Sequence, residues 1–68
     1  MIIDLIEGRN GIMRYTADIA PHIGETISTF IDGEKTWRVV GVDHLIAVSA
    51  MGRETEYLQL ITVQVKAA

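Results

Sequence analysis

Cysteine is absent from this chain of 68 residues, and proline occurs only once. Without cysteine, neither a disulfide framework nor a cysteine-ligated zinc site can form. No apolar run approaches the roughly 20 residues that a membrane-spanning helix needs. No basic segment precedes an apolar stretch, so the sequence shows no secretory signal. These absences predict a cytoplasmic protein.

Positive charge is also sparse. Lys and Arg number 6 against 9 Asp and Glu, which gives a formal net charge of −3. Because affinity for a phosphate backbone comes largely from Lys and Arg, this balance disfavours a nucleic-acid partner. The acidic residues form no run, which is typical of an ordinary acidic surface rather than of a nucleic-acid mimic.

Apolar side chains, in contrast, are abundant. Hydrophobic residues make up 49% of the chain, and the mean hydropathy is +0.25. A domain this short buries only about 60% of the surface that its unfolded chain exposes, so its core has little room. Exposed apolar patches commonly mark interfaces. We therefore expect a homo-oligomer or an obligate complex with a protein partner. The alternative is a well-packed monomer with Ile and Val scattered over its surface.

Beta-branched residues dominate short segments that turn signals separate, which is typical of a small all-β fold. The first segment, Met1–Glu7, is apolar on both faces of a strand, so it is either central or covered by a partner. A two-turn helix at that place would be marginal. The other predicted strands are Ile12–Asp18, Glu25–Ile31, Lys35–Val42 with its continuation His44–Ala50, and Tyr57–Val65.

Turns are predicted where residues tolerate a positive φ or cannot join a ladder. Asn10–Gly11 and Asp32–Gly33 each supply the pair that a tight hairpin turn prefers. Pro21 cannot donate to a ladder, so Ile19–Gly24 is a loop. Residues 51–56 read as a polar turn before the last strand.

The register of the second hairpin has two alternatives. A two-residue turn places Ser28 opposite Trp37, whereas a three-residue loop places Thr29 opposite Trp37 and Ile27 opposite Val39. We favour the three-residue loop because it puts Ile27, Trp37 and Val39 on one apolar face, and a slip by one residue would reverse every side chain.

Two interruptions of the strand pattern predict bulges. Gly41 inside a strand indicates a bulge or sharp bend, and a change of phase near Leu60–Ile61 indicates a second one. The sum is a single β domain over residues 1–68, with five to six strands and hairpin connections. The predicted fold class is all-β, either a small SH3-like barrel or a strongly curved antiparallel sheet.

No constellation of catalytic residues is visible. Ser28 and Ser49 lie outside a nucleophile-elbow context, and Asp43 and His44 point to opposite faces of their strand. His22 and His44 are the only histidines, so we expect no metal and no cofactor. We predict that the chain is not an enzyme. A small subunit that acts only inside a larger enzyme is the enzymatic alternative.

Contacts with a partner are best sought among Trp, Tyr and Arg, which dominate the energetics of interfaces. Two adjacent pairs, Arg14–Tyr15 and Trp37–Arg38, combine an aromatic ring with a guanidinium. Trp37 is also a candidate for the core, because it is the largest apolar side chain in the sequence. The predicted partner-binding residues are Trp37, Tyr15, Arg14 and Arg38, with Tyr57 and Arg53 as the second choice.

Two resemblances can be stated. Ile23–Ile27 followed by Arg38–Val42 resembles the carbon storage regulator family of small RNA-binding β dimers, which carry a similar Gly-Glu-Thr segment and a later strand that ends in Gly-Val. This sequence lacks that family's C-terminal helix and basic RNA-contacting segment, so no binding residue is carried over. The run from Pro21 to His44 is similar to uncharacterised small barrel proteins of phages and mobile elements, and such a likeness implies a fold rather than a function.

The sequence therefore predicts a non-enzymatic protein-interaction or assembly module, for example an accessory, structural or inhibitory factor encoded by a phage and acting in the host cytoplasm. The alternative is a small β-barrel regulator that binds RNA or single-stranded DNA, because such barrels combine aromatic side chains with a basic groove.

Overall fold

The computed structural model describes residues 1–51 and 54–68, and the side chains of residues 1–46 and 59–68. The described chain forms five strands and no helix. The strands are β1 (Ile2–Glu7), β2 (Asn10–Thr16), β3 (Thr26–Phe30), β4 (Glu34–Met51) and β5 (Glu54–Ala67). Accordingly, no helix in this part of the chain is long and apolar enough to cross a membrane.

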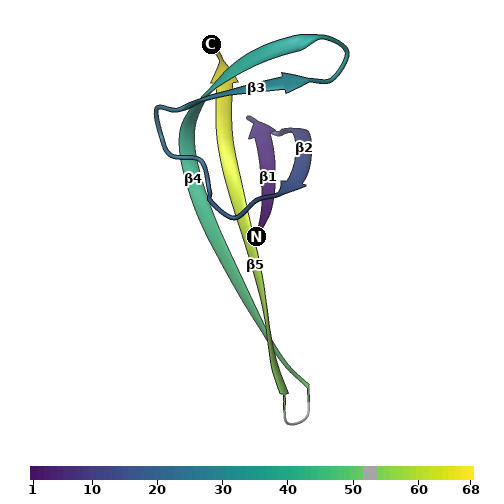
Figure 1. Ribbon diagram of the computed structural model, residues 1–68. Helices are drawn as coiled ribbons and strands as arrows, with labels where there is room; N and C mark the ends of the chain where they lie inside the picture. The colour runs from purple at the N-terminus through teal and green to yellow at the C-terminus, as the bar shows by residue number, and fades with distance from the viewer. Residues whose placement is uncertain (52–53) are drawn as a thin grey trace.

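The five strands form one strongly curled sheet in the order β2-β1-β5-β4-β3, which makes a half-barrel (Figure 1). The prediction of an all-β, strongly curved sheet is therefore confirmed. The two edge strands, β2 and β3, form no ladder with each other, so the barrel is not closed. The sheet is mixed rather than purely antiparallel, because β1 and β5 run parallel. The sequence predicted hairpin connections between consecutive strands. In the structure, β5 instead lies between β1 and β4 and pairs with both of them.

The core lies on the inner face of the curl. Trp37 is 4% exposed, and the other core side chains are fully buried or nearly so. Register explains this set, because residues that oppose each other on neighbouring strands share one face of a sheet. The core residues are Ile3, Leu5, Trp37, Val39, Ile61, Val63 and Val65.

Gly41 bends β4 as predicted. The β4–β5 register shifts between Val39 and Gly41, so Val40 is the extra residue of a bulge. After the bulge, Val42 resumes the inner face, where it packs against the core. The second predicted bulge, at Leu60–Ile61, is wrong, because the register of β5 is continuous there. The sequence pattern misled because β5 carries apolar side chains on both faces: Ile61 is buried in the core, while Leu60 is half-buried on the outer face.

The first hairpin turn lies two residues earlier than predicted. Glu7 pairs with Asn10, so the turn residues are Gly8 and Arg9, and Asn10 and Gly11 already belong to β2. Gly8 has a φ of 60°, and glycine with a positive φ at the first central position is typical of a type II′ turn. Gly8 therefore supplies the positive φ of the hairpin turn, which was expected from the Asn10–Gly11 pair.

The register of the second hairpin also differs from both alternatives, because Ile27 pairs with Trp37. The loop has three residues, Ile31 to Gly33, and the last two have positive φ values of 55° and 108°. The shift from the favoured register is an even number of residues, so Ile27, Trp37 and Val39 still share one face as predicted. The predicted turn over residues 51–56 is too long, because β5 already begins at Glu54.

Candidate functional site

The predicted contact residues do not come together, because adjacent residues of a strand face opposite sides. Tyr15 and Trp37 lie on the inner face, opposite Ile3 and Ile27. Arg14 and Arg38 lie on the outer face and are exposed. The backbone of Tyr57 pairs with that of Val48, but its side chain, like the whole of Arg53, lies outside the described residues. In each of the two aromatic–arginine pairs, the ring and the guanidinium therefore lie on opposite faces of the sheet.

Trp37 is a core residue in this chain. Its ring is buried, and its indole Nε1–H donates a hydrogen bond of 3.0 Å to Thr29 Oγ1. Thr29 is itself buried, with 7% of its surface exposed. The ammonium of Lys35 lies 4.3 Å from the centre of the Trp37 ring, a cation–π contact. These contacts match the core alternative for Trp37, and they leave little of its surface for a partner.

Arg14 is engaged within the sheet. Its guanidinium donates two hydrogen bonds, of 2.6 and 2.9 Å, to the two carboxylate oxygens of Asp4 on β1. The hydrogen bonding lowers the pKa of Asp4 and raises that of Arg14. Tyr15 is half-buried against the core, and this burial raises the pKa of its hydroxyl. A partner that uses Arg14 therefore competes with Asp4 for the same fork of donors.

Arg38 has a different setting. It lies directly opposite Lys66 on β5, and both side chains are exposed. Like charges opposite each other on neighbouring strands repel. Within the described part of the chain, the ion pair that forms is Asp4–Arg14, so no carboxylate of that part neutralises Arg38 and Lys66. Together they form a small positive spot on the outer face.

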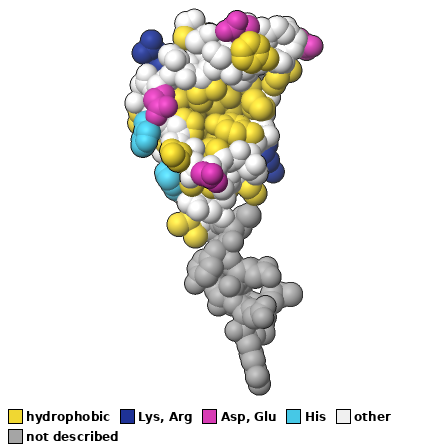
Figure 2. All heavy atoms as spheres, viewed as in Figure 1, with side chains coloured by type: hydrophobic (Ala, Val, Ile, Leu, Met, Phe, Trp, Pro, Cys, Tyr) yellow, Lys and Arg dark blue, Asp and Glu magenta, His cyan; other side chains and the backbone are white. Residues whose placement is uncertain are grey.

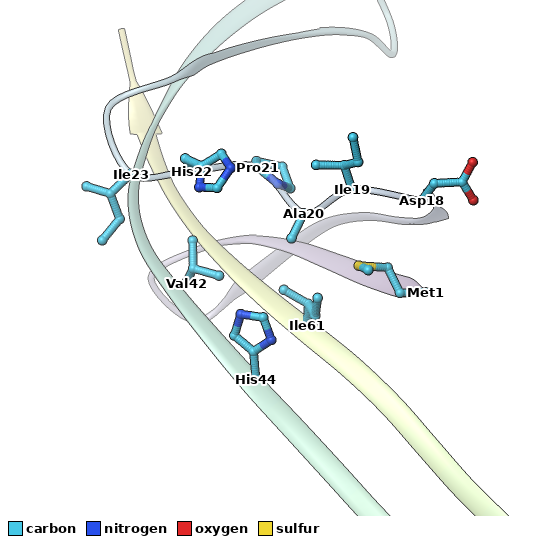
Figure 3. A pocket seen from close by; sticks show the side chains of 10 residues that line it. All are labelled: Met1, Asp18, Ile19, Ala20, Pro21, His22, Ile23, Val42, His44 and Ile61. Carbon is cyan, nitrogen blue, oxygen red and sulfur yellow. The ribbon is translucent and has the colours of Figure 1, made fainter.

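A groove opens on the inner side, between the β2–β3 loop and strands β4 and β5. Its volume is about 500 Å³. Figure 3 shows Val42, His44 and Ile61 pointing from the strands toward the loop, and Ala20 pointing from the loop toward them. The lining is mostly apolar, and its ten residues are Met1, Asp18, Ile19, Ala20, Pro21, His22, Ile23, Val42, His44 and Ile61.

The loop that forms one wall of the groove is fixed at both ends. Ala17 and Met1 exchange backbone hydrogen bonds of 3.0 and 2.8 Å, the second through the amino group. At the other end, Gly24 and Glu25 bond to the backbone of Val39, which extends the β3–β4 ladder. The Glu25 carboxylate also accepts a bond of 2.9 Å from the His22 backbone N–H. These bonds hold the loop across the sheet and fix it as one wall of the groove.

The groove carries few polar side chains. Its titratable side chains are Asp18, His22 and His44. No group of three or more potential metal ligands occurs in the residues that the structure describes. Sequence reasoning treated this loop only as a connection and His22 as a surface residue. The signal that pointed to the groove was two large apolar residues, Ile19 and Ile23, within a loop. They are 75% and 68% exposed.

Comparison with known proteins adds no relative to this description. No family model matches the sequence, no curated protein matches it, and no solved structure matches the fold. The short resemblance to carbon storage regulators thus has no support from a family match.

Proposed function

We propose that this chain is a non-enzymatic protein-interaction or assembly module. The observation that carries the proposal is the grouping of its exposed large apolar side chains. Met1, Ile19 and Ile23 surround the groove, and Leu45 and Ile46 are adjacent on β4. Scattered apolar residues are normal on protein surfaces, whereas groups of them mark interaction sites.

The open side of the half-barrel supports the same function. On the face seen in Figure 2, hydrophobic side chains gather between β3 and the β1–β2 hairpin. An apolar groove next to an unclosed sheet suits a partner that inserts apolar side chains. In the part of the chain that the structure describes, no hydrogen bond joins the side chains of Asp18, His22 and His44, and this supports a non-enzymatic role.

A comparison of variants tests this proposal. The tagged full chain and a variant with Ile19→Lys and Ile23→Lys would be used to capture partners from native lysate at raised salt. We expect the wild-type chain to retain a protein in stoichiometric amount and the double variant to lose it. Phe30→Lys is the matched control, because Phe30 is 74% exposed but lies away from the groove. Equal recovery by all three chains would contradict the assignment of the groove.

The second candidate function is binding of RNA or single-stranded DNA, and the Arg38–Lys66 pair favours it. Two phosphate contacts give a slope of about −1.4 in a plot of log affinity against log salt. We expect Arg38→Ala and Lys66→Ala each to reduce this slope by about half if the pair binds phosphate. A fluorescent oligonucleotide titrated at several salt concentrations measures it. No binding at low salt would remove this candidate and leave the protein partner.

A further inference from the structure

The outer edge of β4 is free over most of its length. β3 covers β4 only from Glu34 to Arg38, and Gly24 and Glu25 continue that cover to Val39. On its other side, β4 pairs with β5 as far as Met51. Beyond Val39, no backbone hydrogen bond to the outer edge of β4 is made by the residues that the structure describes. Within the described part of the chain, this edge therefore presents unpaired backbone groups from Val42 to Ile46.

The same region forms a two-stranded ribbon. β1 pairs with β5 only between Leu60 and Gln64, so β4 and β5 extend beyond the rest of the sheet, as Figure 1 shows. The radius of gyration is 14.0 Å, against about 11 Å for a compact domain of this length. Leu45 is 55% exposed on the outer face of the ribbon, and Ile46 is 63% exposed on the inner face. A two-stranded ribbon that is apolar on both faces is marginally stable in water by itself.

The distribution of charge distinguishes the two edges of the ribbon. In natural proteins, charged residues, especially Lys, and Pro on an edge strand prevent that edge from pairing with another chain. Residues 39–51 contain no Lys, Arg or Pro, and Asp43 is their only charged residue. The corresponding stretch of β5, residues 54–59, contains Glu54 and Glu56. An interface between two copies through β5 would hold four carboxylates, those of Glu54 and Glu56 in each copy, whereas an interface through β4 would hold two, those of Asp43.

The exposed area is also what a dimer requires. A folded monomer of 7.5 kDa exposes about 4,200 Å², while this chain exposes 5128 Å². The excess of roughly 900 Å² is close to the ~800 Å² that each partner buries in an interface of standard size.

We propose that the free edge of β4 is a self-association site at which two copies of this chain pair antiparallel about a two-fold axis. This inference rests on the proposed role in assembly and names a second copy as the partner. The product is a four-stranded ribbon in the order β5-β4-β4-β5, in which both β4 edges are satisfied. An axis near residues 46–48 keeps the two Asp43 side chains at opposite ends of the paired segment. Leu45 and Ile46 then lie within the joined faces.

Sedimentation equilibrium of the purified full chain tests the proposal. We expect a mass of twice 7.5 kDa and a dissociation constant that rises at least about tenfold in Ile46→Lys, because lysine protects edges from pairing. Leu45→Lys, on the opposite face, is the second variant in case the first fails to fold. Phe30→Lys, with a comparable exposure of 74%, should dimerise as the wild type does.

Cysteine cross-linking locates the contact. The chain has no cysteine, so single substitutions across positions 43–49 each introduce one thiol. Opposed residues of an antiparallel pair lie within disulfide distance. Under mild oxidation, we expect linked dimer to peak at one position of β4 and to fall off on both sides, while cysteines at positions 56–60 of β5 link poorly.

Two results would overturn the inference. A monomer at every concentration refutes self-association through β4, and the chain can still bind a different protein through the groove. A dimer that neither β4 lysine weakens and no β4 cysteine links uses another surface, which refutes this site but not assembly.

Discussion

At the residue scale, the polar groups of Arg14 and Trp37 form hydrogen bonds to side chains on neighbouring strands of the sheet. Arg14 is bound by Asp4 across two strands, and the Trp37 indole is satisfied by Thr29 inside the core. Both residues attract attention in a sequence because arginine and tryptophan are common in interfaces. Their hydrogen-bond partners, Asp4 and Thr29, lie on neighbouring strands. The strand register decides that these side chains come close enough to bond.

The Asp4–Arg14 pair makes the folding stability of the chain depend on pH. Because the pKa of Asp4 is lowered in the folded chain, the pair stabilises the fold above the ordinary carboxyl pKa, and this contribution is lost as the pH falls through the lowered value. We expect Asp4→Asn to unfold at lower urea concentration than the wild type at pH 7. The two chains should converge in acid, once the pH lies below the lowered pKa and Asp4 is protonated.

Urea titrations followed by circular dichroism measure both conditions. Asp43→Asn is the control, because Asp43 lies on the same outer face and forms no ion pair in the described residues. A difference between Asp4→Asn and the wild type that stays unchanged as the pH is lowered step by step into acid would contradict the ion-pair explanation.

The Trp37–Thr29 hydrogen bond couples β4 to the edge strand β3. Thr29→Val leaves the buried indole N–H without its acceptor, so we expect a loss of about 1–3 kcal/mol in the free energy of unfolding. The double-mutant cycle with Trp37→Phe should show a coupling of about 0.5–3 kcal/mol. Denaturant unfolding followed by circular dichroism gives all four free energies. Strict additivity of the two substitutions would show that the bond contributes nothing.

At the element scale, turns and bulges decide where each strand lies. The sequence indicated the strand segments along the chain and the bulge at Gly41, because alternation of apolar residues and an interior glycine are local signals. It placed both hairpin registers wrongly. Register depends on which residue adopts a positive φ, and several neighbouring residues were able to do so, namely Gly8 or the Asn10–Gly11 pair in the first hairpin.

Glycine substitutions separate a required turn residue from a permitted one. Gly33 has a φ of 108°, so Gly33→Ala should destabilise the chain by about 1–3 kcal/mol through backbone strain. Gly11 has no positive φ, and no atom would contact an added Cβ within 4 Å. Gly11→Ala should therefore be neutral or stabilising by up to ~1 kcal/mol. Thermal and urea unfolding of both variants measure the difference, and equal effects would argue against the observed turns.

At the scale of the whole molecule, the chain is an open curl with a protruding ribbon and not a closed barrel. In the part of the chain whose side chains are described, seven core residues occupy one face of the sheet, while groups of apolar residues remain exposed at the groove, at the β3–β4 turn and along β4. Composition alone led to the expectation of association, and the structure adds where exposed apolar side chains gather.

If dimerisation through β4 is coupled to folding, the melting temperature depends on protein concentration. For a dimer of two 68-residue chains, a hundredfold rise in concentration should raise the midpoint by about 10 °C. Calorimetry at several concentrations measures the shift, and Phe30→Lys should behave as the wild type does. Ile46→Lys should lose most of the dependence. A midpoint independent of concentration in the wild type would separate folding from assembly.

Local chemistry in the sequence determined the all-β class, the strand segments and the bend at Gly41, because each follows from the preferences of neighbouring residues. Tertiary structure decided the parallel β1–β5 pair, the burial of Trp37, the Asp4–Arg14 pair and the groove under the β2–β3 loop. Each of these joins residues that are distant along the chain or depends on a register. A shift of one residue exchanges the two faces of a strand, so sequence alone did not determine which side chains meet.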